Sequence, residues 1–149
     1  MRRCQKILNT RIALIKMVPS HYTGSYQQNF KKTKQLNSKG DPVFQSMVKY
    51  GAPVIVHLMD MLDDTTVTKL FNSCTNKNYT VGDLAFLLID EIEWIPFALV
   101  IKMQWCTFRA CGSLPDYFWD YLRENRKSFK QNYQTYYYSK ERKAVQRSK

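Results

Sequence analysis

The sequence lacks several patterns on which common biochemical activities depend. It has five glycines in 149 residues, and none of them forms the GxxxxGK or GxGxxG pattern of a phosphate-binding loop. The two histidines, His21 and His57, and the four cysteines, which form no CxxC pair, give no zinc-ligand spacing. From these absences we expect no bound metal and no cofactor.

Long apolar runs are also missing. The longest, Leu84 to Ile89, has six residues, whereas a bilayer span needs about 20. At the N-terminus, Arg11 and Lys16 interrupt the apolar stretch that a secretory signal requires, although an acid-free, Arg-rich start also resembles a transit peptide or a surface helix. We expect no membrane span. The compartment stays open between the bacterial cytoplasm, which is favoured, and the periplasm if an upstream signal has been lost.

Acidic residues are absent from residues 1–40, which hold nine Lys and Arg. Residues 41–122 hold five against ten acids, and residues 123–149 hold nine against two, so the net charge of +11 comes from the flanks. A nucleic-acid-binding fold usually carries its cations on the folded face that meets phosphate. We therefore predict a basic, mostly unstructured or amphipathic segment over 1–40, one helical domain over 41–138 and a basic tail over 139–149.

Helix start signals recur from residue 41 onward, where a cap or a proline precedes apolar residues spaced three and four apart. The predicted helices begin at Asp41–Pro42, Pro53, Thr80, Pro96 and Pro115, and a last one covers residues 128–142. Gly51 and Gly112 are predicted stops. No segment alternates convincingly with a period of two residues. The predicted fold is therefore all-α, a compact bundle of about five or six helices with flexible basic ends.

Residues 65–79, TTVTKLFNSCTNKNY, are predicted to form a polar connection between two helices. Loops of this length without structure of their own are often functional. The acidic turn and loop start are therefore a candidate contact surface, formed by Asp63, Asp64, Thr65 and Thr66. The alternative is that the two aspartates only end the preceding helix and that the loop is solvated.

The segment from Lys77 to Val100 raises the question whether its four carboxylates are catalytic. Thr80 and Asp83 have the spacing of a capping box. On a helical wheel Asp83 and Asp90 fall opposite the apolar face, with Glu93 towards its edge. We predict that these acids face water and compensate the helix dipole. Convergence of Asp60, Asp83 and Asp90 on a cavity or a cation would contradict that interpretation.

The stretch GAPVIVHLMDMLDD, followed by VGDLAFLLIDEI, resembles the helix pair of a HEAT-type repeat, with a proline-started first helix, an acidic turn and a Val-x-x-x-Ala second helix. Residues 52–95 match the length of about 40–47 residues of that repeat. The wider pattern from Leu62 to Gln104 is also similar to small uncharacterised bacterial helical proteins. These resemblances imply HEAT-like helix pairs and no activity.

The leading functional hypothesis is a non-catalytic protein-interaction module of unknown partner, which binds through exposed helix faces and the 63–79 turn and loop. The alternative is a nucleic-acid-binding protein that uses the basic, tyrosine-rich C-terminal segment. Its candidate residues are Arg123, Arg126, Lys127, Lys130, Tyr133 and Tyr137. In the competing interpretation, Phe129, Tyr133 and Tyr137 pack onto the domain while the cations face water.

The cysteines allow two states. Either the thiols are reduced, or a disulfide joins Cys106 and Cys111, or either of them with Cys74, in an oxidising compartment. Intact mass with and without reductant distinguishes these states. A hydrolase that uses Cys74 or Cys106 with His57 is a third functional class, but His57 lies between two apolar residues and is predicted to sit at the edge of the core.

Overall fold

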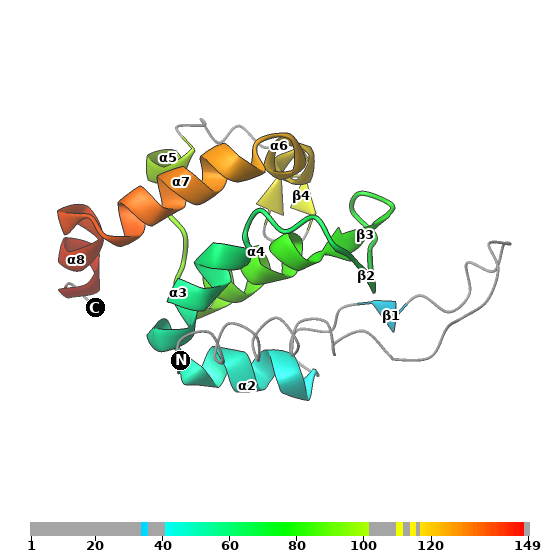
Figure 1. Cartoon of the computed structure of the whole chain (residues 1–149), viewed down its shortest axis with the longest axis horizontal. Coiled ribbons are helices and arrows are strands. Elements are labelled where there is room, and N and C mark those ends of the chain that lie inside the picture. Colours follow the sequence, from blue (N-terminus) through cyan, green and yellow to red (C-terminus); the bar gives the residue numbers. More distant parts are fainter. Residues whose placement is uncertain (1–33, 36–40, 102–109, 112–113, 116, 148–149) are drawn as a thin grey trace, which may run out of the picture.

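The computed structural model describes residues 34–35, 41–101, 110–111, 114–115 and 117–147. The helices are α2 (Pro42–Tyr50), α3 (Ala52–Met61), α4 (Val81–Ile92), α5 (Phe97–Val100), α6 (Phe118–Glu124), α7 (Arg126–Tyr137) and α8 (Lys140–Arg147). The strands are β1 (Lys34–Gln35), β2 (Val67–Asn72), β3 (Lys77–Thr80), β4 (Ala110–Cys111) and β5 (Leu114–Pro115). The mostly helical body is thus confirmed, whereas the prediction of a purely all-α fold is wrong (Figure 1).

The first helices start and stop at the residues that the sequence marks. Asp41 Oδ1 accepts hydrogen bonds from the amides of Val43 and Phe44 at 2.9 and 3.1 Å, which caps α2. Gly51 ends α2 with a φ of 66°, a conformation that favours glycine. The structure therefore contains the predicted cap and stop of α2.

The predicted polar connection over 65–79 is instead a β-hairpin. Strands β2 and β3 pair antiparallel, with Phe71 opposite Asn78 and Asn72 opposite Lys77. Asn76 in the turn has a φ of 53°, which asparagine tolerates better than most residues. Strand β1 pairs parallel with β2, so the sheet order is β1-β2-β3.

The sequence did not predict the hairpin because the buried side chains of β2 include both polar and apolar residues. Thr68, Leu70 and Asn72 are buried, while Val67 and Lys69 point to solvent. Thr68 Oγ1 donates to the Tyr79 carbonyl at 2.8 Å, so the hydroxyl is satisfied across the hairpin. A strand that buries a hydroxyl and an amide gives no apolar alternation, although its side chains do alternate.

One predicted helix start is wrong, and three other predicted segments lie partly outside the described residues. The basic tail over 139–149 contains α8, because Lys140–Arg147 is helical. The predicted helix start at Pro115 lies in β5, and α6 begins at Phe118. The helix predicted from Pro96 is described as α5 over Phe97–Val100, and residues 102–109 of that prediction lie outside the described residues. Within the predicted N-terminal segment, residues 34–35 form β1 and the rest lies outside the described residues.

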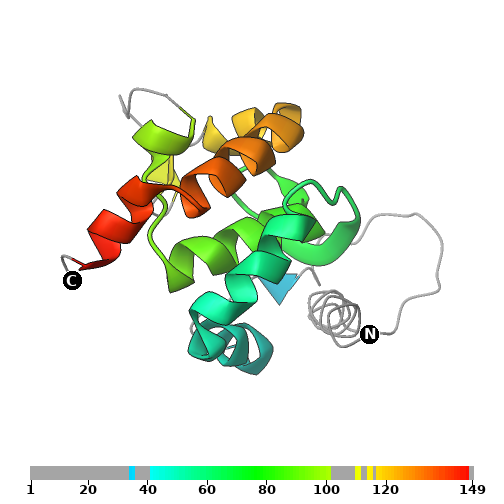
Figure 2. The same cartoon turned by 60° about the vertical axis from the view of Figure 1, so that its left-hand side comes forward.

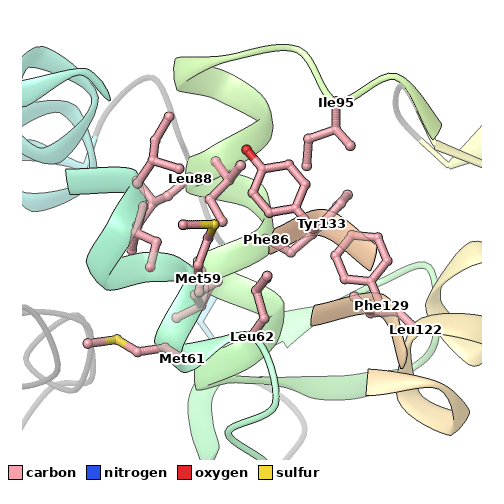
Figure 3. Close-up of a cluster of buried hydrophobic side chains, with 14 of the residues drawn as sticks. Met59, Met61, Leu62, Phe86, Leu88, Ile95, Leu122, Phe129 and Tyr133 are labelled. Carbon is pink, nitrogen blue, oxygen red and sulfur yellow. The ribbon is translucent and has the colours of Figure 1, made fainter. Parts of the chain in front are cut away.

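Helix α4 runs through the middle of the core. Its described neighbours include α2 and α3, and α7 contacts α3 and reaches Phe86 of α4 through Phe129 (Figures 1 and 2). Phe86 of α4 contacts the rings of Phe97, Phe118 and Phe129 with centroid distances of 5.9, 4.8 and 5.8 Å. Figure 3 shows the side chains of Phe129 and Tyr133 from α7 facing Phe86 and Leu88 across this core. Aromatic packing thus joins segments far apart in the sequence.

Candidate interaction surface

The acidic turn after α3 is fixed by contacts on both sides. Asp63 Oδ1 accepts a bond from Lys130 Nζ at 2.7 Å, and the same ammonium donates to the Asp60 carbonyl at 2.9 Å. Asp64 Oδ1 accepts from the Thr66 amide at 2.9 Å, and its carbonyl accepts from the Gly82 amide at 2.9 Å. The two aspartates therefore hold the turn, and their carboxylates serve the fold.

The residues that follow the turn are exposed and continue into the hairpin. Thr65 and Thr66 lie on the surface, and Val67 at the start of β2 is 67% exposed. Lys69 on the same row of β2 is also exposed. We call Thr65, Thr66, Val67 and Lys69 the hairpin surface. Of the four contact residues predicted from the sequence, Thr65 and Thr66 are exposed, whereas Asp63 and Asp64 are half-buried.

The backbone behind the hairpin surface depends on a close approach at Gly82. A Cβ on this residue would lie 2.5 Å from the Leu62 carbonyl oxygen and 2.7 Å from Arg126 Nη1. Glycine therefore allows the first turn of α4 to contact the end of α3. A larger residue at this position would collide with that carbonyl oxygen.

The prediction that Asp83 faces water is wrong, because its side chain is fully buried. Asp83 Oδ1 accepts a bond from Arg126 Nη2 at 2.7 Å, and Arg123 Nη2 lies 3.9 Å from Oδ2. The predicted capping box is present: Thr80 N donates to Asp83 Oδ2 at 2.8 Å, and Asp83 N donates to Thr80 Oγ1 at 3.2 Å. Arg126 of α7 packs against the face of α4 that the helical wheel predicts to be exposed to solvent.

Asp90 and Glu93 lie towards the other end of α4. Asp90 is half-buried and its Oδ1 accepts a bond from the Ile95 amide at 3.2 Å. Burial raises the pKa of Asp90, the Ile95 amide opposes that rise, and the nearby charge of Glu91 adds to it. Glu93 accepts two bonds from Arg142, from Nε at 2.5 Å and from Nη2 at 2.6 Å. These acids have separate structural partners.

No metal site is formed in the part of the chain that the structure describes, since it holds no cluster of three or more His, Cys, Asp or Glu suited to a metal ion. Asp60, exposed at the end of α3, Asp83 and Asp90 have different surroundings: Asp83 is buried on Arg126, and Asp90 bonds the Ile95 amide. The arrangement that would have contradicted the core-helix interpretation is therefore not found among the described residues.

The nucleic-acid candidates on α6 and α7 are largely engaged inside the protein. Arg126 and Tyr133 are buried, and Lys130 binds Asp63. Burial also raises the pKa of the Tyr133 hydroxyl. Arg123 donates to Thr75 Oγ1 at 3.2 Å.

Two candidates remain outside this set. Lys127 is exposed, whereas Tyr137 is half-buried beneath the guanidinium of Arg142, whose Cζ lies 3.8 Å from the ring centroid. Tyr133 and Phe129 pack onto the domain, as the interpretation that competes with nucleic-acid binding predicts. The placement differs for Arg126, which was predicted to face water or phosphate.

Cys74, in the turn of the hairpin, is disulfide-bonded. Its partner lies among the cysteines whose side chains are not described, so the pairing with Cys106 or Cys111 stays a prediction. A disulfide sulfur carries no thiolate, which removes Cys74 as the nucleophile of the hydrolase hypothesis in this state. His57 on α3 is half-buried, as expected for a residue at the edge of the core.

Large apolar side chains on the surface were missed by the sequence analysis. Tyr50, Trp94, Leu99 and Tyr138 are 76%, 65%, 57% and 63% exposed. Trp94 and Leu99 stand in apolar runs around Pro96, and Tyr138 ends a tyrosine run whose neighbours Tyr136 and Tyr137 turn inward. Composition marks such residues as core, so the sequence held no signal that they are exposed.

Among the described residues, the structure contains no helix that has both the length and the apolar character of a membrane span. Comparison of the chain with protein-family models, curated proteins and solved structures finds no match.

Proposed function

We propose that the chain is a non-catalytic protein-interaction module that binds its partner through the hairpin surface. One observation carries the proposal. The start of β2 is exposed, with Val67 67% exposed, and the backbone of the turn before it is held by hydrogen bonds. The Asp64 bonds to Thr66 and Gly82 and the Lys130 bonds to Asp63 and Asp60 hold the turn in place. A preorganised surface loses little conformational entropy on binding.

Three carboxylates of the described residues support the same proposal. Asp63, Asp83 and Glu93 each bond to a cation from α7 or α8. A general acid or base must be free to reach a substrate, and these groups are engaged in the fold. The exposed residues of the hairpin surface are hydroxyl, aliphatic and ammonium groups, which suit recognition better than acid–base chemistry.

Site-specific photo-crosslinking tests the proposal in the full chain. A photoreactive phenylalanine analogue replaces Val67, and the matched control carries it at Tyr50, which is also highly exposed but lies on α2. We expect a discrete protein adduct from position 67 in cells and none from position 50. Equal labelling at both positions, or no adduct from position 67, would contradict binding through the hairpin surface.

A further inference from the structure

A second exposed apolar group lies away from the hairpin. Trp94 comes from the link between α4 and α5, Leu99 from α5 and Tyr138 from the end of α7, and all three are more than half exposed. Lys140 and Lys143 on the neighbouring helix α8 are exposed as well. We call these five residues the α8-end surface. Figures 1 and 2 place α5 and α8 towards one end of the molecule and the sheet of β1 to β3 towards the other.

One ion pair organises the α8-end surface. Glu93, which precedes Trp94, accepts both bonds from Arg142 of α8. The same guanidinium covers the Tyr137 ring at 3.8 Å, and Tyr137 meets the Tyr138 ring edge to face with centroids 5.1 Å apart. Trp94 therefore follows the acid of this partly buried pair in sequence, and the Tyr138 ring adjoins the pair through Tyr137. Leu99 lies on the following turn, where its amide donates to the Pro96 carbonyl at 2.9 Å.

Helix α8 carries a net positive charge, while Glu91 before Trp94 is an exposed acid at the same end. Residues 140–147 contain four Lys and Arg and one acid, Glu141. Arg142 is engaged with Glu93, whereas Lys140 and Lys143 are exposed. The complementary ligand is therefore anionic, and it must also offer an apolar medium to Trp94 and Leu99.

Two anionic ligands are common in cells, nucleic acid and phospholipid. On α7, Arg126 and Lys130 already bind Asp83 and Asp63, so they are not available as phosphate contacts. The aliphatic side chain of Leu99 gives no face on which a base can stack. Trp and Tyr, in contrast, favour the headgroup level of a bilayer, an aliphatic side chain enters the acyl boundary, and lysines reach anionic lipids.

We propose that the α8-end surface docks on an anionic phospholipid membrane. Trp94, Leu99 and Tyr138 enter the interface, while Lys140 and Lys143 contact lipid phosphates. The protein lies on the membrane and does not span it. This inference is independent of the proposed function, because it uses the opposite end of the molecule and leaves the hairpin surface free.

Co-flotation of the full chain with vesicles tests the proposal. We expect binding to phosphatidylcholine vesicles that contain phosphatidylglycerol, much weaker binding to phosphatidylcholine alone, and weakening by salt. Trp94→Ala should lower the partition coefficient about tenfold. Lys140→Gln and Lys143→Gln should each lower it by about fivefold. Leu99→Ser should act in the same direction as Trp94→Ala.

Tyr50→Ala is the matched control, because Tyr50 is an exposed aromatic residue outside the α8-end surface and its loss should leave binding unchanged. Circular dichroism melting verifies that every variant is folded. Absence of binding to the anionic vesicles overturns the proposal, as does equal binding by wild type and the Trp94 and lysine variants. Retention on a single-stranded oligonucleotide without vesicle binding overturns it in favour of nucleic acid.

Discussion

The two ends of helix α4 hold their carboxylates in different ways. At the first turn Asp83 is fully buried, caps the helix and is bonded to Arg126. Towards the last turn Asp90 is half-buried and accepts a backbone bond from Ile95. Both are aspartates on the polar side of one helical wheel. The difference between them therefore comes from Arg126 of α7, which meets Asp83 at the first turn, whereas Asp90 meets a backbone amide.

Neutralising a carboxylate should have different effects on stability at the two ends of α4. A buried ion pair gains little net stability from its attraction, because removing both charges from water costs several kcal/mol. Loss of one partner is nevertheless damaging, because the other charge stays buried and unpaired. A half-buried carboxylate such as Asp90 keeps part of its hydration, so it tolerates neutralisation. Four substitutions should distinguish these cases.

The largest effect should follow Asp83→Asn. The change leaves Arg126 buried without its anion and weakens the cap, so the free energy of unfolding should fall by about 3 kcal/mol. Urea denaturation measures this value, with Asp90→Asn as the matched control on the same helix. Similar small losses from both substitutions would show that burial of Asp83 carries no special cost.

Gly82→Ala should come next. The added Cβ would lie 2.5 Å from the Leu62 carbonyl oxygen and 3.0 Å from that of Asp64, so the backbone of α3 or α4 must move. We expect a loss of about 1–3 kcal/mol, measured as a lower thermal midpoint. In an unobstructed helix the same change stabilises by about 1 kcal/mol. A rise in the midpoint would therefore contradict the close approach.

Glu93→Gln should have a smaller and more local effect. It removes the charge that receives two bonds from Arg142, at a cost of about 1.5 kcal/mol. Hydrogen exchange should accelerate at the amides of α8, because Arg142 ties this helix to the end of α4. Lys127→Gln on exposed α7 surface is the control. Unchanged exchange in α8 would mean that other contacts hold it.

Asp90→Asn should have the smallest effect and the opposite sign. Because burial raises the folded-state pKa of Asp90 above its unfolded value of about 4, the folded state binds the proton more tightly. This contribution to stability is present below the unfolded pKa and is lost as the pH rises through the folded pKa.

Asparagine is neutral and keeps an oxygen for the Ile95 amide. Asp90→Asn should therefore be slightly more stable than wild type at neutral pH, and the difference should vanish in acid. Unfolding curves at several pH values measure this. A destabilised variant at neutral pH would show that the charged form of Asp90 contributes to the fold.

Local signals in the sequence predicted much of the helical structure. The Asp41 cap, the Gly51 stop and the Thr80–Asp83 capping box are all present, because each depends on bonds within a few residues. The hairpin over 67–80 was missed because β2 buries Thr68 and Asn72, whose side-chain oxygens bond to the backbone within the hairpin. Apolar periodicity does not detect a strand that buries polar side chains.

The contacts of the candidate site residues could not be predicted from the sequence. Asp63 and Asp64 were correctly placed at a turn, but their carboxylates bind Lys130 and the Thr66 amide. Trp94 and Leu99 gave the same apolar signal as core residues, although both are exposed. Exposure depends on which other segments cover a residue, and no short stretch of sequence contains that information.

By itself, the sequence determined the helical nature of the chain and the caps that start α2 and α4, because those bonds form between near neighbours. The tertiary structure alone decided which charges are buried and which rings are exposed. Arg126 reaches Asp83 from 43 positions along the chain, and Arg142 reaches Glu93 from 49. A carboxylate can be buried where a cation pairs with it, and the tertiary fold determines which carboxylates receive such a partner.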